Sequence, residues 1–243
     1  MRKVFIADAH LRNATDPNYR RLLSFLAEMQ GNTETLFILG DLFEFWIGYR
    51  QVPFTQYYPV LDQLRQLVES GTELIYFEGN HDFHMGPFFK ETLKAQIHRS
   101  AATLELDGKR VYLCHGDQIN RGDIGYRVLR FLLHNSLSAA LVPVIPVNLV
   151  TKVAERMGRT SRKGHQRHRL KWDYMAILRE FAAARFNEGH DALITGHFHL
   201  PLLEKESSNG ADRTLLSLGD WITHFSYGEW EDGQLTLKTY AGA

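Results

Sequence analysis

The chain has 243 residues, enough to bury a substantial core in one large domain, with or without an insertion. Lysine plus arginine equals aspartate plus glutamate, at 28 each, so no strong overall field would recruit nucleic acid or a membrane. The single cysteine, Cys114, excludes a framework of internal disulfides and is typical of a reducing cytoplasm. The apolar run that starts at Val4 is too short for a secretory signal peptide, so we expect a cytoplasmic protein.

Five hydrophobic runs follow one another along the chain, and each ends in residues that can bind a metal ion. They span residues 4–10, 36–41, 74–82, 111–117 and 193–199. A continuous apolar run is typical of a buried parallel strand, and α/β folds place their sites at the carboxyl ends of such strands. We therefore expect five strands that direct their terminal residues toward one edge. These residues are Asp8, His10, Asp41, Asn80, His81, Asp82, His115, His197 and His199.

Apolar residues at helical spacing occupy the segments between the runs. The first helical pattern opens with Asp16 and Pro17 and closes at Gly31, and the others cover residues 60–68 and 177–186. Alternation of strand and helix indicates right-handed crossovers and a mostly parallel sheet core. We expect these helices to pack on the sheet.

The C-terminal segment has strand-like runs instead, over residues 215–218, 225–230 and 235–240. Asp232 and Gly233 lie between the last two runs and favour a tight hairpin. Together, these patterns predict an α/β fold built as a layered sandwich.

Residues 118 to about 188 contain a long helical stretch with no new strand. We expect it to form a helical insertion, or cap, beside the site within a single domain that spans residues 1–243. Residues 131–150 are nearly all apolar, but polar residues and prolines interrupt them. Two short amphipathic helices therefore fit better than a membrane-spanning helix, which needs about 20 uninterrupted apolar residues. The interruptions are Asn135, Pro143, Pro146 and Asn148.

The two halves of this insertion leave two interpretations open. The apolar half can pack as core, or it can form a groove that faces a lipid or a membrane. Residues 156–171 carry five arginines, two lysines and no acidic residue. A solvated surface and a contact with phosphate groups both explain such a basic run.

The terminal residues of the five runs offer carboxylate, amide and imidazole groups, a mixture that suits two divalent ions. Oxygen ligands suit Mn²⁺ or Mg²⁺, and imidazoles suit Mn²⁺, Fe²⁺ or Zn²⁺. Two ions about 3.5–4 Å apart can clamp a phosphoryl group and activate water, so no serine or cysteine nucleophile is needed. Each motif alone also fits a hydrogen-bonded histidine or a turn residue. The ordered set favours a metal centre because motif and structural context agree.

These motifs resemble the signature of the calcineurin-like metallophosphoesterases, which is D-x-H, G-D, G-N-H-[DE], a later H and G-H-x-H. The resemblance implies the metallophosphoesterase sandwich and a dinuclear metal centre. It also implies His81 as the acid that assists the leaving group and holds phosphate oxygens, with Asp82 orienting its ring. It places Asp8, His10, Asp41 and His199 on one metal ion, and Asp41, Asn80, His115 and His197 on the other.

Residues 5–11, 38–48, 79–83, 115–117 and 123–126 are also similar to the bacterial UDP-2,3-diacylglucosamine pyrophosphatases of lipid A biosynthesis. This resemblance implies attack of water, activated between two metal ions, on the α-phosphate of the UDP moiety. UMP and 2,3-diacylglucosamine 1-phosphate are then released. It implies two divalent ions, with Mn²⁺ the first choice and Mg²⁺, Fe²⁺ or Zn²⁺ as alternatives, a cap that takes the acyl chains, and a peripheral position on the inner membrane. Substrate contacts are expected at Asn80, Asp123 and Arg159.

One departure keeps other functions open. His81 stands where the best-known enzymes of that group have arginine, and histidine can donate a proton where arginine only stabilises charge. An alternative is therefore a two-metal phosphoesterase of the same family that acts on another nucleotide, phospholipid-type or phosphodiester substrate. Balanced charge disfavours nucleic acid, although residues 156–171 keep it possible. A non-catalytic membrane or lipid-carrying module is disfavoured by the complete ligand set.

Overall fold

The structure is a computed structural model that describes residues 1–146, 172–208 and 211–242. One sheet has the strand order β13-β12-β1-β2-β4-β6. Within it β1, β2, β4 and β6 run parallel, while β12 and β13 add an antiparallel edge. The strands are β1 (Arg2–Ile6), β2 (Thr33–Leu39), β4 (Glu73–Phe77), β6 (Gln96–His98), β12 (Ser226–Glu231) and β13 (Gln234–Thr239).

A second sheet has the order β10-β11-β9-β8-β7, with β11, β9 and β8 parallel and both edge strands antiparallel. Its strands are β7 (Ala102–Leu106), β8 (Lys109–Cys114), β9 (Ala192–Thr195), β10 (Pro201–Ser208) and β11 (Ala211–Leu218). The two sheets face each other across a core that contains Phe5, Phe37, Ile194 and Leu216. The predicted parallel strands are therefore confirmed, but they belong to two stacked sheets.

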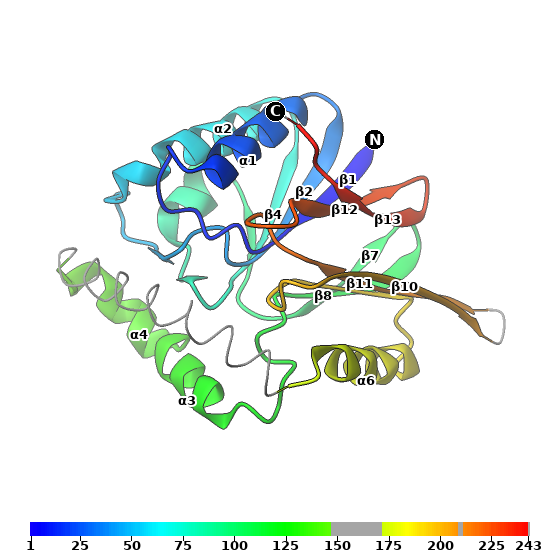
Figure 1. Ribbon diagram of the computed structural model, residues 1–243. Coiled ribbons are helices and arrows are strands. Elements are labelled where there is room, and N and C mark those ends of the chain that lie inside the picture. The colour runs from blue at the N-terminus through cyan, green and yellow to red at the C-terminus, as the bar shows by residue number, and fades with distance from the viewer. Residues whose placement is uncertain (147–171, 209–210, 243) are drawn as a thin grey trace.

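Helices cover the outer faces of both sheets, which confirms the layered α/β sandwich (Figure 1). Helices α1 (Pro17–Glu28) and α2 (Tyr58–Glu69) pack on the first sheet, and α6 (Tyr174–Asn187) packs on the second. Their buried faces carry the predicted apolar residues, for example Leu22, Leu64 and Leu178. Asp16 occupies the N-cap position of α1, but its carboxylate accepts a hydrogen bond from the amide of Asn13 and makes no capping hydrogen bond to the helix.

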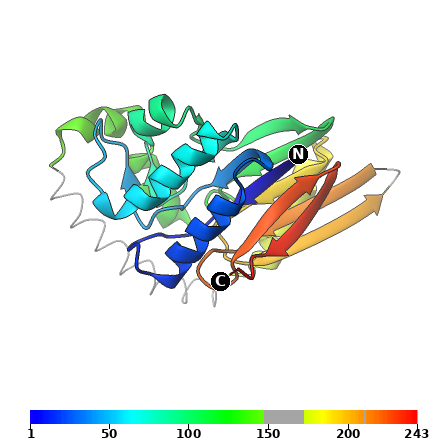
Figure 2. The same ribbon diagram turned by 90° about the horizontal axis from the view of Figure 1, so that it is seen from above.

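The predicted C-terminal hairpin is confirmed between β12 and β13. Asp232 and Gly233 have φ values of 50° and 72°, the left-handed pair that a tight two-residue hairpin turn requires. This hairpin and the β10–β11 hairpin extend on the same side of the molecule, away from α3 and α4 (Figures 1 and 2).

Short elements connect these layers. They are β3 (Trp46–Ile47), β5 (Asp82–Phe83), η1 (Thr55–Tyr57) and η2 (Phe88–Thr92). Strands β3 and β5 pair in parallel, so the segment after β2 lies against the segment after β4. Trp46 is fully buried between Phe43 and Phe89, and its Nε1 donates to the carbonyl of Met85. The aromatic run after Asp41 is therefore core packing beneath the loops that follow β2 and β4.

The expected insertion begins with two short helices that project from one side of the sandwich (Figure 1). They are α3 (Ile124–Leu133) and α4 (Ser136–Leu141), followed by η3 (Val142–Val144). The chain breaks at Asn135, whose side chain accepts a hydrogen bond from the amide of Ser138 at 2.9 Å and caps α4. The prediction of broken helices is thus confirmed as far as residue 146.

Within the described residues, no helix is long and apolar enough to cross a membrane. The later part of the expected insertion includes α6, which is a layer of the sandwich. Asn148, Arg159 and the basic run at 156–171 lie outside the described residues. A single domain with an insertion at about 118–188 stays a prediction.

Candidate metal centre

The predicted ligands follow the carboxyl ends of strands in both sheets. Asp8 follows β1, Asp41 follows β2 and Asn80 follows β4, while His115 follows β8. His197 and His199 follow β9 in the same second sheet. Backbone hydrogen bonds tie the loops together, because Asp8 donates to the Gly40 carbonyl at 3.1 Å and Gly196 to the His115 carbonyl at 2.8 Å. The facing sheets therefore bring the loops to one edge of the sandwich.

The backbone at this edge repeatedly adopts the strained left-handed conformation. The positive φ values that favour glycine occur at five of the predicted ligands, between 44° and 70°. Such conformations cost free energy and cluster at functional sites, where the surrounding structure enforces them. The five residues are Asp8, His10, Asp41, His197 and His199.

Two glycines allow the loops after β2 and β4 to approach closely. A Cβ atom on Gly40 would lie 2.7 Å from the Cα of Gly79, and one on Gly79 would lie 2.2 Å from Oδ1 of Asp41. Neither position can hold a side chain without moving a predicted ligand. The glycines of the G-D and G-N-H motifs are therefore required by packing at the site.

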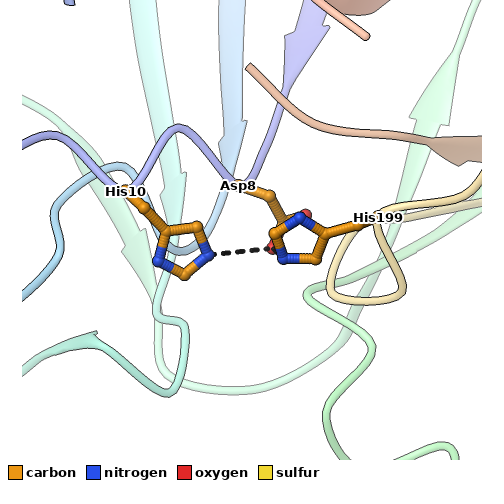
Figure 3. Close-up of side chains that lie close together, drawn as sticks. All are labelled: Asp8, His10 and His199. Atoms are coloured by element: carbon orange, nitrogen blue, oxygen red, sulfur yellow. Dashed lines mark ion pairs between the residues drawn. The ribbon is translucent and has the colours of Figure 1, made fainter. Parts of the chain in front are cut away.

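The first donor cluster consists of Asp8, His10 and His199 (Figure 3). Oδ1 of Asp8 lies 3.9 Å from Nε2 of His10 and 3.6 Å from Nε2 of His199. Asp8 is fully buried, and its Oδ1 has no hydrogen-bond partner in the described part of the chain; the same holds for Nε2 of His10. Buried polar atoms almost always have a partner, so this pair of atoms fits the ligand set of a cation.

The second donor cluster consists of Asp41, Asn80, His115 and His197. Oδ1 of Asn80 lies 3.0 Å from both Nε2 of His115 and Nδ1 of His197, and Oδ2 of Asp41 lies 3.5 Å from Nε2 of His115. The same Oδ2 lies 3.7 Å from Nε2 of His10 in the first cluster. Asp41 is thus placed between the clusters, as a bridging carboxylate must be.

The electrostatics of these buried groups also suit metal ligation. Burial lowers the pKa of His10 well below its usual value, so this imidazole is neutral, the form that binds metals. Burial raises the pKa of Asp8 to about 6. Burial opposes ionisation of Asp41 as well, but His115 and His81 outweigh it and hold that pKa well below the usual range. Against its own burial, Asp41 raises the pKa of His115 to about 10, so a cation would replace a proton there.

His81 lies beside the first cluster. Its ring meets the ring of His10 edge-on at 4.7 Å between centroids, and its Nδ1 lies 2.7 Å from the carbonyl oxygen of Glu44. A proton on Nδ1 that is donated to this carbonyl fixes the orientation of the ring.

The expected role of Asp82 in orienting His81 is wrong. Its fully buried carboxylate accepts hydrogen bonds from the amides of Asp41 at 2.9 Å and Leu42 at 2.7 Å, and from the hydroxyl of Tyr76 at 2.6 Å. It also accepts the amide of Gly79 at 3.0 Å. Asp82 therefore holds the loops after β2 and β4 together, because backbone amides near it outcompete the neighbouring ring.

Sequence reasoning missed two carboxylates beside the first cluster. Oδ2 of Asp220 lies 3.4 Å from Nδ1 of His199. Burial by itself would raise the pKa of Asp220, but hydrogen bonds with His199 and with three backbone amides outweigh it and hold that pKa well below its usual value. Oε2 of Glu44 lies 3.8 Å from Nδ1 of His10 and 3.0 Å from Nε of Arg12. The only sequence signal for Asp220 is its place after the apolar run at 215–218.

The predicted substrate residues are less closely placed. Asn80 belongs to the second cluster, as described above. Asp123 immediately precedes α3, where its carbonyl accepts the amide of Arg127 at 3.1 Å, and it is absent from the donor clusters of the described residues. Arg159 lies outside the described residues. Cys114, next to His115, is buried at 3.6 Å from Oγ1 of Thr195, and burial raises its pKa to about 12, as fits a core residue.

Comparison with known proteins defines the class. A family model described as calcineurin-like phosphoesterase matches residues 1–201. The chain therefore belongs to the calcineurin-like phosphoesterase family, and the predicted resemblance is confirmed. Membership makes it a metal-dependent hydrolase, and the family's divalent ions suit the two donor clusters.

Curated relatives carry a more specific name. A protein of Porphyromonas gingivalis named UDP-2,3-diacylglucosamine hydrolase is 31% identical over 255 residues, which cover 97% of this chain and 96% of the relative. Relatives with the same name from Pseudomonas putida and Salmonella arizonae are each 31% identical, with 90–91% of both chains covered. The similarity therefore extends through residues 118–188, where the insertion is predicted.

Proposed function

We propose that this protein hydrolyses the pyrophosphate bond of UDP-2,3-diacylglucosamine to UMP and 2,3-diacylglucosamine 1-phosphate. The observation that carries the proposal is the convergence of two buried donor clusters that share Asp41. The relatives named UDP-2,3-diacylglucosamine hydrolase align with 90% or more of the chain, and their name supports this substrate.

We assign the ligands by cluster. Asp8, His10 and His199 would hold the first ion, Asn80, His115 and His197 would hold the second, and the Asp41 carboxylate would be available to both. When bound, the two ions supply Lewis acidity and lower the pKa of water for attack at neutral pH. The mixed oxygen and nitrogen donors suit Mn²⁺, which we propose as the ion, with Mg²⁺, Fe²⁺ or Zn²⁺ as alternatives.

The chain's own groups complete the reaction. Asn80 holds a phosphate oxygen near the second cluster. Water adds to the α-phosphorus through its oxygen and releases a proton to solvent, and the bond from that phosphorus to the oxygen bridging the β-phosphate breaks. His81 donates a proton from Nε2 to the departing 2,3-diacylglucosamine 1-phosphate, while its Nδ1 remains held by the Glu44 carbonyl. Asp123 and Arg159 stay predicted substrate contacts.

The apolar surface of α3, α4 and η3 supports a lipid substrate. Its exposed side chains include Phe131, of which 76% is accessible, and Ile124, of which 70% is accessible. Large exposed apolar patches mark sites of contact with ligands, proteins or membranes. We propose that this surface takes the acyl chains and rests against the inner membrane. It comprises Ile124, Val128, Leu129, Phe131, Leu132, Leu137, Leu141 and Val144.

The test is turnover of a substrate panel by the purified protein with Mn²⁺ and after chelation. The panel holds UDP-2,3-diacylglucosamine, a UDP-sugar without acyl chains, and a simple aromatic phosphodiester. We expect metal-dependent hydrolysis of the lipid, and in ¹⁸O-labelled water we expect the label in UMP because water attacks the α-phosphorus. An intact lipid beside a hydrolysed phosphodiester would favour the alternative substrate class, which the histidine at position 81 suits.

A further inference from the structure

Asp220 is a buried carboxylate to which the proposed reaction gives no role. It follows β11 at the edge where the ligands gather, and its side chain is 2% exposed. The preceding Gly219 has a φ of 78°, and a Cβ atom there would lie 2.3 Å from Oγ of Ser226. The chain therefore turns sharply at this point and directs Asp220 inward.

The turn after Asp220 fixes its carboxylate. Oδ1 accepts hydrogen bonds from the amides of Ile222 at 2.9 Å, Thr223 at 2.6 Å and His224 at 3.1 Å. The amide of Trp221 donates to the carbonyl of Asp8 at 3.1 Å, and the Trp221 ring is fully buried. Asp220 is thus held rigidly against the loop that carries Asp8.

The other oxygen of Asp220 faces two imidazoles. Oδ2 lies 2.9 Å from Nδ1 of His224 and 3.4 Å from Nδ1 of His199. The opposite nitrogen of His199, Nε2, is the one that lies 3.6 Å from Oδ1 of Asp8. A carboxylate only accepts hydrogen bonds, so it favours the His199 tautomer with the proton on Nδ1 and the lone pair on Nε2.

One ligand of the second cluster, His115, is supported differently. Nδ1 of His115 faces the carbonyl oxygen of Leu39 at 2.7 Å, which is a neutral acceptor. In the first cluster, His199 faces the Asp220 carboxylate at 3.4 Å, while the Glu44 carboxylate lies 3.8 Å from Nδ1 of His10, beyond hydrogen-bond distance. Carboxylates raise the basicity of a ligating imidazole more than neutral acceptors do, and such support tunes metal affinity.

We propose that Asp220 is a positioning residue that fixes the tautomer of His199 and thereby makes the first cluster the tighter of the two metal positions. This inference rests on the proposed two-metal centre. It assigns a role to a residue that contributes no ligand atom, through the geometry of Oδ2 between two histidines.

The test is the substitution Asp220→Asn. The asparagine oxygen can still accept the three amides of the turn, so the fold is retained. Its NH₂ group, however, presents a donor to His199, which favours the tautomer with the proton on Nε2 and removes the lone pair that a metal needs. In Mn²⁺ titrations of the full chain, we expect the wild type to bind two ions and the variant to bind one of them about 10–100-fold more weakly.

The matched control is His224→Phe, which removes the other partner of Oδ2 and should leave both affinities close to wild type. A second variant, Asp220→Ser, keeps an acceptor for the turn but is too short to reach His199. It should weaken the same position less than asparagine does, because serine imposes no wrong tautomer. Thermal unfolding of each variant checks that the fold is retained.

A spectroscopic measurement separates positioning from a purely structural role. In the Zn²⁺-loaded chain with ¹⁵N-labelled histidine, the His199 signal, assigned with His199→Gln, should show a proton on Nδ1 that Asp220→Asn removes. Two equally tight ions in Asp220→Asn, or an unchanged His199 signal, would overturn the inference and leave the proposed function standing. A wild-type chain that binds no metal would overturn both.

Discussion

The ligand-bearing edge and the α3–α4 segment are built in opposite ways. At the edge, Asp8 and Asp82 are fully buried, and three of their four carboxylate oxygens accept hydrogen bonds from backbone amides. In α3 and α4 the largest apolar side chains are exposed, for example Phe131 and Leu137. Chemistry on a phosphate needs atoms placed to within a fraction of an ångström, whereas contact with acyl chains needs apolar area and little direction.

The two regions are nevertheless connected, because residues of the ligand-bearing loops contact α3. His84, three residues after His81, places Nε2 2.9 Å from the carbonyl of Leu133 at the end of α3. Asp117, two residues after His115, pairs with Arg130 of α3 at 2.5 Å. The loops that bring the metal ligands therefore also hold α3. A lipid bound to α3, as proposed, would thus be linked to the centre through only one or two residues of backbone.

The largest effect is expected from Asp41→Asn, which tests whether the ligand-bearing edge depends on one shared carboxylate. The amide oxygen can keep the hydrogen bond that Oδ1 accepts from the His81 amide at 2.8 Å, so the loops should stay in place. Loss of the bridging charge should release at least one ion and lower turnover about 1000-fold, because a bound ion contributes several kcal/mol to the transition state.

Metal content and kcat should be measured together, with Asp62→Asn as the control on the exposed face of α2. A variant that keeps two ions and more than a tenth of wild-type turnover would contradict the bridging assignment.

A smaller effect, confined to lipid substrates, is expected from the double substitution Phe131→Ser and Leu132→Ser. Both side chains are more than half exposed, so the fold should tolerate the change. Burial of one such side chain against lipid is worth about 1.5–3 kcal/mol, so KM for UDP-2,3-diacylglucosamine and binding to lipid vesicles should weaken about 10–100-fold.

Hydrolysis of a simple phosphodiester should not change, and Tyr58→Ser, at an exposed aromatic residue of α2, serves as the control. Equal losses on both substrates would mean that α3 acts on the centre and does not merely bind lipid.

The contrast also explains what the sequence could reveal. Asp8, Asp41, Asn80, His115 and His199 could be predicted because each follows an apolar strand, and parallel strands in stacked sheets end at the same edge. The broken helices were visible in Asn135 and the prolines of residues 131–146.

Other features depend on neighbours that are distant in sequence. Asp220 reaches His199 only because β11 lies beside β9, and no local pattern records that pairing. Asp82 was assigned to His81 by adjacency, yet its partners include the amides of Asp41 and Leu42, some 40 residues away. Trp46 follows Asp41 by only five residues but belongs to the core, because β3 pairs with β5.

The smallest effect concerns pH and the attachment of α3. The ring of His134, directly after α3, packs in a tilted orientation against Phe83 at 4.6 Å between centroids. Burial, aided by the charge of Arg130, lowers its pKa from 6.5 to about 3. The native state therefore keeps His134 neutral, while the unfolded or detached segment takes up a proton below pH 6.5. Stability of the attachment should be constant above pH 6.5 and fall by about 1.4 kcal/mol for each pH unit below it, until about pH 3.

Hydrogen exchange of the α3 amides at pH 7.5 and 5.5, corrected for intrinsic rates, measures this slope. His134→Phe keeps an aromatic ring against Phe83 but cannot take up a proton. Between pH 7.5 and 5.5, the opening of α3 should therefore increase about tenfold less in this variant than in the wild type. Amides of α2, which packs on the first sheet, report the response of the remaining chain and should behave alike in both proteins. If α3 opens with the same pH dependence in the wild type and the variant, protonation of His134 does not control the attachment of α3. The pH dependence must then come from the pair of Arg130 and Asp117.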